Sequence, residues 1–155
     1  GEQLGCKIFV EDLSKDIDRH VKQGTVEQLP EFLASRFPQG DDTFDGILCW
    51  DVFDFLDKAA TQALAKQLSR VLRPDGVLLA LFNATEQMDP AMRSHYVRHV
   101  VVDREHLQHR PYSAAARRQK PLPNRDIQRL FEPLRVTEQF LMKTNVREVL
   151  FRKPA

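Results

Sequence analysis

The segment FDGILCWDVFDFLDKAATQALAKQLSRVLRPDGVLLALFN, from Phe44 to Asn83, holds the clearest pattern in this 155-residue chain. Gly46 to Trp50 is a short apolar run that ends at an acid, and its length favours a buried strand over a helix. After Asp57, a good helix N-cap, apolar residues recur at helical spacing. Val77 to Phe82 is a second unbroken apolar run. The three elements predict a parallel strand–helix–strand unit, covered by helices on both faces of its sheet.

The turn Pro74-Asp75-Gly76 separates the predicted helix from the second strand. With Leu72-Arg73 before it and the strand that follows Phe44-Asp45, this turn resembles the fourth and fifth strands of class I S-adenosylmethionine-dependent methyltransferases. The resemblance implies an α/β fold with a Rossmann-like, doubly wound and mostly parallel sheet. It also implies S-adenosylmethionine as the cofactor.

The C-terminal residues extend the resemblance over nearly the whole chain. Asn124 is expected to cap a helix from Arg125 to Leu134. Val136 to Lys143 and Arg147 to Arg152 are predicted to be two strands joined near Thr144-Asn145 as an antiparallel hairpin. A helix and a hairpin here are similar to the sixth and seventh strands of the family. They count against a nucleotide-binding or dehydrogenase-like domain, whose sheet would continue with parallel strands.

Near the N-terminus, Cys6 to Val10 is predicted to be a strand followed by Glu11 and Asp12. In the family, the second strand ends in an acid that accepts hydrogen bonds from both ribose hydroxyls of the cofactor. A carboxylate suits this task because it offers acceptors to two neighbouring donors. The resemblance therefore implies that Glu11 or Asp12 binds the ribose. The alternative is that these acids cap a helix that starts between Asp12 and Lys15.

The next residues predict two helices. Asp16 to Gln23 is amphipathic and ends at Gly24, and Val26 to Phe37 follows with Pro30 near its first turn. The third strand of the family would fall in this region, and Thr25 to Leu29 shows a remnant of it.

The carboxyl end of the strand at Gly46 to Trp50 is the second part of the expected site, because open parallel sheets bind ligands at that edge. The resemblance implies that this loop borders the methionine part of the cofactor. Asp51 would bind the cofactor's ammonium or position a substrate group, and Trp50 would wall the pocket. The alternatives are a solvated acid or helix cap for Asp51 and core packing for Trp50. The implied cofactor-binding residues are Glu11, Asp12, Cys49, Trp50 and Asp51.

No catalytic residue is identified by the sequence. Asp51, Asp54 or a histidine of the basic segment described next would be the base, if the reaction needs one. The four histidines of that segment lack a metal-ligand spacing with acids or thiols, so no metal site is predicted.

Residues 86–120 are interpreted as a basic insert that contains a strand at Tyr96 to Asp103. From Arg93 to Lys120 it carries seven lysines and arginines against two acids. Insertions at this place in the family commonly shape substrate binding, and a basic one would favour an anionic substrate or a nucleic-acid backbone. Because few aromatic residues accompany the charges, nucleic acid is not expected as a partner. The alternative is a solvated basic surface.

Composition indicates one soluble domain, residues 1–155. The formal net charge is +1, no apolar run approaches the roughly 20 residues of a membrane span, and no signal-peptide pattern opens the chain. Cys6 and Cys49 lie in apolar runs and are expected to be free buried thiols. These features predict a cytoplasmic protein without a membrane partner.

The family's glycine-rich loop does not occur among the six glycines of the chain. In the family that loop follows the first strand and lets the backbone approach the cofactor. The expectation is therefore a fragment of a longer methyltransferase, whose first strand and loop would precede Gly1. Such a fragment would derive from an enzyme that moves the sulfonium methyl group to an acceptor not identified here, while this chain alone would be inactive. The alternative is a non-catalytic, methyltransferase-like binding or assembly module.

A missing first strand has a structural consequence. In the family order 3-2-1-4-5-7-6 that strand is central, and its loss would leave two strand edges with unpaired amides. Either Cys6 to Val10 pairs directly with Gly46 to Trp50, or a second chain contributes a strand. The sequence thus predicts a rearranged sheet or a homodimer with exchanged elements.

Overall fold

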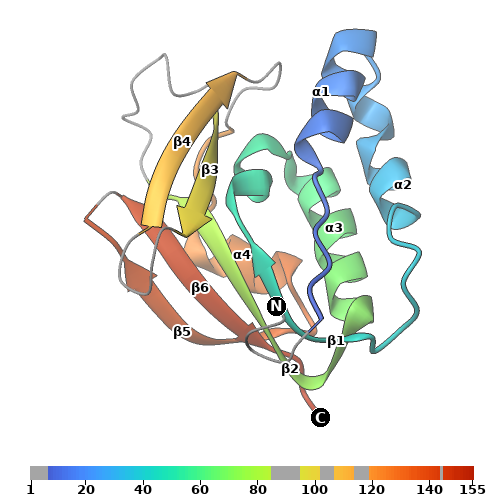
Figure 1. Cartoon of the computed structure of the whole chain (residues 1–155). Helices are drawn as coiled ribbons and strands as arrows, with labels where there is room; N and C mark the ends of the chain where they lie inside the picture. The colour runs from blue at the N-terminus through green and yellow to red at the C-terminus, as the bar shows by residue number, and fades with distance from the viewer. Residues whose placement is uncertain (1–6, 85–94, 102–106, 114–118, 144) are drawn as a thin grey trace.

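The computed structural model describes residues 7–84, 95–101, 107–113, 119–143 and 145–155 (Figure 1). Within these ranges the chain forms helices and strands in the following order: α1 (Ser14–Gln23), η2 (Val26–Gln28), α2 (Leu29–Ala34), β1 (Phe44–Cys49), η3 (Asp51–Phe55), α3 (Lys58–Val71), β2 (Leu72–Asn83), β3 (His95–Val101), β4 (Leu107–Ser113), α4 (Asn124–Leu130), β5 (Arg135–Leu141) and β6 (Val146–Arg152). None of the helices in the described ranges is long and apolar enough to cross a membrane.

The main sheet has the strand order β1-β2-β6-β5. β1 and β2 are parallel and are joined by α3, which confirms the predicted strand–helix–strand unit. β6 is antiparallel to both β2 and β5, which confirms the C-terminal hairpin. The described sheet is mixed: β1, β2 and β5 run in one direction and β6 runs against them, which agrees with a parallel unit that ends in an antiparallel hairpin. β3 and β4 form a separate antiparallel pair.

The strand predicted at Cys6 to Val10 is not observed within the described residues. Residues 7–10 have no strand assignment, and Cys6 lies outside the described residues. The segment leads into α1 without pairing with β1. Its C-terminal end is held on the far side of a groove, because the Glu11 carboxylate binds Arg36 at 3.0 Å and Leu13 is buried. The predicted direct pairing with Gly46 to Trp50 is therefore wrong.

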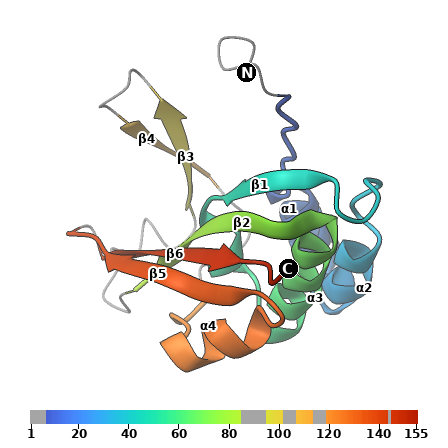
Figure 2. The ribbon, with the colours of Figure 1, turned by 90° about the horizontal axis from the view of Figure 1, so that it is seen from below.

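Helices α2, α3 and α4 lie on one face of the main sheet (Figure 2). That face presents Leu78 and Ala80 of β2, which lie opposite Phe151 and Val149 of β6, and all four side chains are buried. The Phe131 ring, just after α4, stacks on Phe151 with centroids 4.5 Å apart. Helical cover of both faces, as expected for a doubly wound sheet, is not observed within the described part of the chain. Side chains alternate between the faces of a strand, so one face of this sheet carries the core.

The region between α1 and β1 differs from its prediction. α1 ends as expected at Gly24, which adopts a left-handed φ of 68°. The strand remnant at Thr25 to Leu29 is wrong, because this stretch contains the 3₁₀ helix η2. Pro30 lies in the first turn of α2, where its missing N–H costs nothing, so the helix restarts there and ends at Ala34 rather than Phe37.

The turn before the second strand is a bulge within β2. β2 begins at Leu72, opposite Phe44, and after the bulge Val77 lies opposite Gly46. A Cβ atom on Gly76 would lie 2.7 Å from the Arg73 carbonyl oxygen, so only glycine fits without displacing the backbone.

The helix near the C-terminus is shorter than predicted. Asn124 is the first residue of α4 and makes no capping hydrogen bond; Pro123 occupies the N-cap position, and the helix ends at Leu130. Because proline has a fixed φ and no N–H, Pro123 directs the chain into the helix without a side-chain cap.

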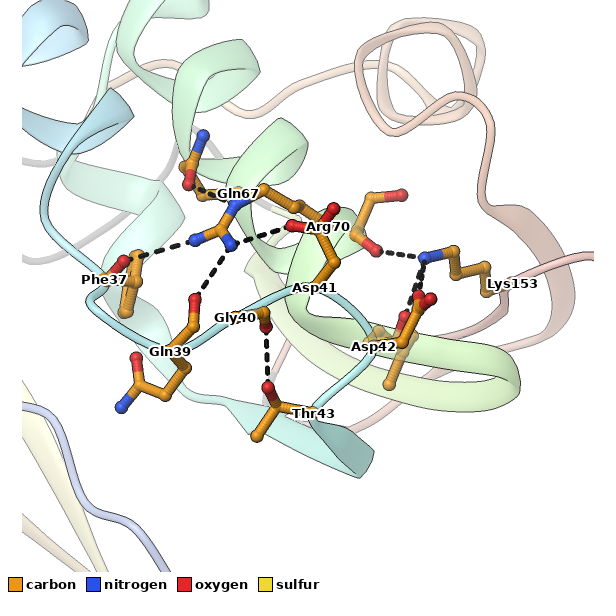
Figure 3. Close-up of polar contacts among 11 residues, drawn as sticks. Phe37, Gln39, Gly40, Asp41, Asp42, Thr43, Gln67, Arg70 and Lys153 are labelled. Atoms are coloured by element: carbon orange, nitrogen blue, oxygen red, sulfur yellow. Dashed lines mark hydrogen bonds and ion pairs between the residues drawn. The ribbon is translucent and has the colours of Figure 1, made fainter.

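Two cations hold the loop that leads into β1 (Figure 3). Arg70 of α3 donates hydrogen bonds to the carbonyl oxygens of Phe37 and Gln39 at 3.2 and 2.8 Å. Lys153 donates to the carbonyl oxygens of Ser69 and Leu72 at 2.8 and 2.7 Å, and it also binds Asp42 at 3.0 Å. The C-terminal end of α3 is thereby tied to both the loop and the C-terminal residues, which fixes the start of β1.

Candidate functional site

A groove of about 710 Å³ runs along the free edge of β1. Residues 7–14 form one wall, β1 and Trp50 form the other, and Leu64, Leu68 and Val71 of α3 contribute apolar surface between them. Glu11, Asp12, Cys49 and Trp50 all line this groove. The structure thus brings together four of the five residues implied as cofactor ligands.

The two acids of the groove are held in different ways. Glu11 Oε2 accepts a hydrogen bond from Arg36 Nη2 at 3.0 Å. Asp12 Oδ1 accepts hydrogen bonds from both the backbone N–H, at 3.0 Å, and the hydroxyl of Ser14, the first residue of α1. Asp12 therefore anchors the start of the helix, in agreement with the alternative interpretation of these acids. Each carboxylate keeps one further oxygen outside these bonds, so a capping role does not prevent ligand binding.

Arg36 is a functional neighbour that the sequence did not reveal. Its Nε also binds Asp16 Oδ2 of α1 at 3.0 Å, so one guanidinium joins two acids. The hydrogen bond with Asp16 is the largest cause of the raised pKa of Arg36; burial acts against it, and the bond with Glu11 adds to it. Arg36 and Glu11 are 25 positions apart, and no local pattern connects them.

Cys49 closes the carboxyl end of β1 as a neutral thiol. Desolvation raises its pKa from 9.0 to about 12. The thiolate is the nucleophilic form of cysteine, so a thiol with this pKa is suited to packing against a ligand rather than to attacking one. Cys49 is free, as expected; Cys6 lies outside the described residues.

The residues after Cys49 turn away from the strand into η3. Trp50 has an extended backbone, is 38% exposed and lines the end of the groove. Asp51 begins η3, while its side chain is outside the described part of the structure. The predicted role of Asp51 in binding the cofactor's ammonium therefore stays a prediction.

Asp54 has a structural task in this fold. Its Oδ1 accepts a hydrogen bond from the backbone N–H of Asn83, at the end of β2, at 2.8 Å. Its carbonyl oxygen accepts a hydrogen bond from the N–H of Gln119 at 2.6 Å. Asp54 does not line the groove. Its two hydrogen bonds link η3 to β2 and to the segment before α4.

The basic insert is described only in the backbone of β3 and β4. The predicted strand at Tyr96 to Asp103 corresponds to β3, whose backbone places His99 opposite His109 of β4. Asp103 and the rest of the insert up to residue 118 outside these two strands are not described. Within the described ranges, no three His, Cys, Asp or Glu side chains are grouped so as to hold a metal ion.

Comparison with known families identifies the fold. A model of the methyltransferase domain matches residues 2–80, just over half of the 155 residues. The chain belongs to the methyltransferase domain family. The match includes the N-terminal wall of the groove, β1, α3 and most of β2, so the residues gathered at the groove all come from the matched region. None of the curated protein sequences is significantly similar to the chain.

Solved structures of other proteins, two of them described as methyltransferases, share this fold. The PH0226 protein of Pyrococcus horikoshii OT3 matches with a TM-score of 0.61 and 15% identity over 98% of this chain and 75% of its own. A methyltransferase of Clostridium acetobutylicum, described as S-adenosylmethionine-dependent, matches with a TM-score of 0.54 and 13% identity, over 79% of this chain and 63% of its own. A 1,6-didemethyltoxoflavin-N1-methyltransferase of Burkholderia thailandensis, solved with S-adenosylhomocysteine bound, matches with a TM-score of 0.51 and 12% identity, over 79% of this chain and 48% of its own.

These structural similarities establish the fold alone, because the identities are low. This chain spans less than two thirds of the length of the Clostridium and Burkholderia enzymes. The methyltransferase-like fold with a four-stranded mixed sheet is thus established, whereas ligands and substrate belong to the proposal that follows.

Proposed function

We propose that this chain binds S-adenosylmethionine in the groove beside β1 and provides part of a methyl-transfer site. The observation that carries this proposal is the convergence of Glu11 and Asp12 with Cys49 and Trp50 on one groove. Its volume of about 710 Å³ lies within the roughly 300–1,000 Å³ of small-molecule sites. A carboxylate pair at one wall and an aromatic ring at the other would suit a ligand with a polar ribose and flat base.

The strand order supports this placement. β1-β2-β6-β5 corresponds to positions 4-5-7-6 of the class I methyltransferase order, and β6 is the antiparallel strand that this order requires. By this correspondence, residues 7–10 occupy the position of the second strand, and the groove is the position of the first. We therefore propose that this sheet is part of a Rossmann-like methyltransferase fold.

Asp12 is the better candidate for the ribose acceptor. The charge of Glu11 is already paired with Arg36, whereas the described ligands of Asp12 are the N–H and hydroxyl of Ser14. A carboxylate that keeps its charge and one oxygen accepts strong hydrogen bonds from two hydroxyl donors. Glu11, with Arg36, would hold the wall in place.

When bound, S-adenosylmethionine supplies an electrophilic methyl group on a positively charged sulfur. The protein's share is chiefly orientation: Asp12 would fix the ribose, Trp50 would limit the pocket, and the neutral Cys49 would provide apolar contact. Asp51 is the remaining candidate to hold the ammonium group or to take a proton from the acceptor. Asp54 is not proposed as the base, because its carboxylate already positions Asn83.

Calorimetric titration with S-adenosylhomocysteine tests this proposal. Asp12→Asn retains a side-chain oxygen for Ser14 but removes the charge, and we expect it to weaken binding at least about tenfold. Glu11→Gln, which lies next to it and loses the ion pair with Arg36, should weaken binding less. Equal affinities of Asp12→Asn and the unchanged chain would refute the assignment of Asp12.

A non-catalytic binding module is the second candidate. It is favoured by the six glycines at positions 1, 5, 24, 40, 46 and 76, which form no glycine-rich loop of the kind that accompanies the cofactor in the family. Such a module would be folded and would not bind S-adenosylhomocysteine. The same titration therefore separates the two candidates.

A further inference from the structure

β1 is an edge strand. It pairs with β2 on one side, and the described residues place no strand on its other side, which faces the groove. Figure 2 shows β1 at the border of the main sheet. An edge of this kind presents unpaired N–H and C=O groups, which serve as a template for another strand.

The groove has room for one short strand. Strands lie about 4.8 Å apart within a sheet and rise about 3.3 Å per residue, and packed sheets lie about 10 Å apart, so a strand residue occupies roughly 160 Å³. At about 710 Å³, the groove would therefore hold about four or five residues of extended chain.

Residues 7–10, Lys-Ile-Phe-Val, are a segment of that length without a strand partner in the described structure. The exposed fractions of Ile8, Phe9 and Val10 are 63%, 59% and 86%. The ring of Phe9 touches that of Phe44 across the groove, with centroids 5.4 Å apart. Three consecutive apolar side chains with this exposure mark an interaction surface.

Apart from this ring contact at the start of β1, the segment forms no strand pairing with β1 of its own molecule. The ion pair between Glu11 and Arg36 and the burial of Leu13 hold its C-terminal end on the far wall. Residues 7–10 precede these anchors, so the exchange proposed below would move them about Glu11 while α1 keeps its place. The same molecule thus carries an open edge at β1 and an apolar segment that is not paired with it in the described structure.

We propose that two copies of this chain exchange residues 7–10, each copy adding this segment as a strand to the free edge of its partner's β1. Residues 7–10 of one copy and residues 45–48 of the other are complementary in charge and in apolar pattern when they pair in parallel. Lys7 then lies beside Asp45, whose side chain is 86% exposed and also binds Arg73. The three apolar residues that follow Lys7 then lie beside the next three residues of β1: Gly46, Ile47 and Leu48.

The register also explains an exposed residue of β1. Leu48 is 64% exposed although it belongs to a strand of the main sheet. In the proposed pairing it would contact Val10 of the second copy. An antiparallel pairing would place Lys7 against Leu48 and Val10 against Asp45, which opposes charge to apolar surface at both ends. This inference concerns assembly and does not depend on cofactor binding.

Sedimentation velocity with matched variants tests the exchange. The unchanged chain should form a dimer, and Val10→Asp should raise the dimer dissociation constant at least about tenfold, because the added charge would meet Leu48. Val10 is 86% exposed in the single chain, so this variant should fold. Phe140→Asp, at a 57% exposed site on β5, should leave the dissociation constant unchanged. A chain that is monomeric up to about 100 µM, or a dimer weakened only by Phe140→Asp, would overturn the proposal.

A disulfide test checks which chains pair and in which register. The test uses a chain without its natural cysteines, with Cys6→Ser and Cys49→Ala. In this background Val10→Cys and Leu48→Cys together should give a covalent dimer under mild oxidation. Neighbouring strand residues fall within the roughly 4.4–6.8 Å Cα separation of a disulfide. Lys7→Cys with Leu48→Cys, which is out of register, should give little. A disulfide that leaves the mass of a monomer would mean that the segment pairs with its own β1, and the exchange would be rejected.

Discussion

At the scale of single residues, Cys49 gives the simplest electrostatic prediction. Its pKa is raised from 9.0 to about 12, so the folded chain keeps a proton that the unfolded chain loses above pH 9. The unfolded state then binds fewer protons, and the free energy of unfolding falls as the pH rises from about 9 towards 12. Below about pH 8 this contribution is constant.

Urea unfolding at about pH 8 and about pH 10 measures this effect. The unchanged chain should lose more stability between the two pH values than Cys49→Ala, which has no thiol to titrate. The same loss in both proteins would show that Cys49 is not desolvated as the structure indicates.

Gly76 gives a steric prediction. An added Cβ would lie 2.7 Å from the Arg73 carbonyl oxygen and from Leu72 Cδ1, so Gly76→Ala should lower the free energy of unfolding by about 1–3 kcal/mol. Gly40→Ala is the matched control, because no atom lies within 4 Å of its added Cβ and its φ is not positive. If the two variants are equally stable, the bulge of β2 does not require glycine.

At the scale of elements, the C-terminal end of α3 depends on a residue from the end of the chain. Lys153 is 19% exposed in its side chain and binds the carbonyl oxygens of Ser69 and Leu72 (Figure 3). Lys153→Met removes a charged donor from both carbonyl oxygens, so the free energy of unfolding should fall by about 1–3 kcal/mol.

Lys66→Met is the control for this change, because Lys66 lies on an exposed position of the same helix. Chemical denaturation of both variants should show a loss for Lys153→Met and a change within about 0.5 kcal/mol for Lys66→Met. Similar losses would mean that the lost charge, and not the capping of α3, causes the effect.

The elements also show what the sequence predicts well. The β1–α3–β2 unit and the β5–β6 hairpin follow from local signals: the periodicity of apolar residues, the Asp57 cap, which accepts a hydrogen bond from Ala60 N at 2.9 Å, and the turn at Gly76. Cys6 to Val10 has an equally strand-like pattern. Whether that segment forms a strand depends on a pairing partner that is distant in the chain. The hydrogen bond between Arg36 and Glu11, which holds the end of the segment, is also between residues far apart in the sequence.

The candidate site follows from the sequence in part. Glu11, Asp12, Cys49 and Trp50, which the family resemblance implies as cofactor ligands, line one groove, and their binding roles stay a prediction. It did not separate the roles of the two acids, since the separation comes from their contacts with Arg36 and Ser14. It also proposed Asp54 as a base, whereas the carboxylate is used to hold the end of β2.

At the scale of the whole molecule, the groove beside β1 is the feature on which both proposals depend. A strand of four or five residues would fill most of the groove's volume of about 710 Å³, so an added strand and a cofactor are alternative occupants of it. If both proposals hold, dimer formation should lower the affinity for S-adenosylhomocysteine, and Val10→Asp should raise it at concentrations where the unchanged chain is dimeric.

Fluorescence of Trp50 during a titration with S-adenosylhomocysteine is the measurement to make first. Trp50 is the single tryptophan of the chain, it is 38% exposed, and it lines the groove, so the signal comes from the proposed site. We expect a saturable change in intensity or wavelength that is weakened at least about tenfold by Asp12→Asn. A folded chain whose Trp50 emission is unaffected by the ligand, and which releases or takes up no heat with it, would contradict a cofactor site beside β1.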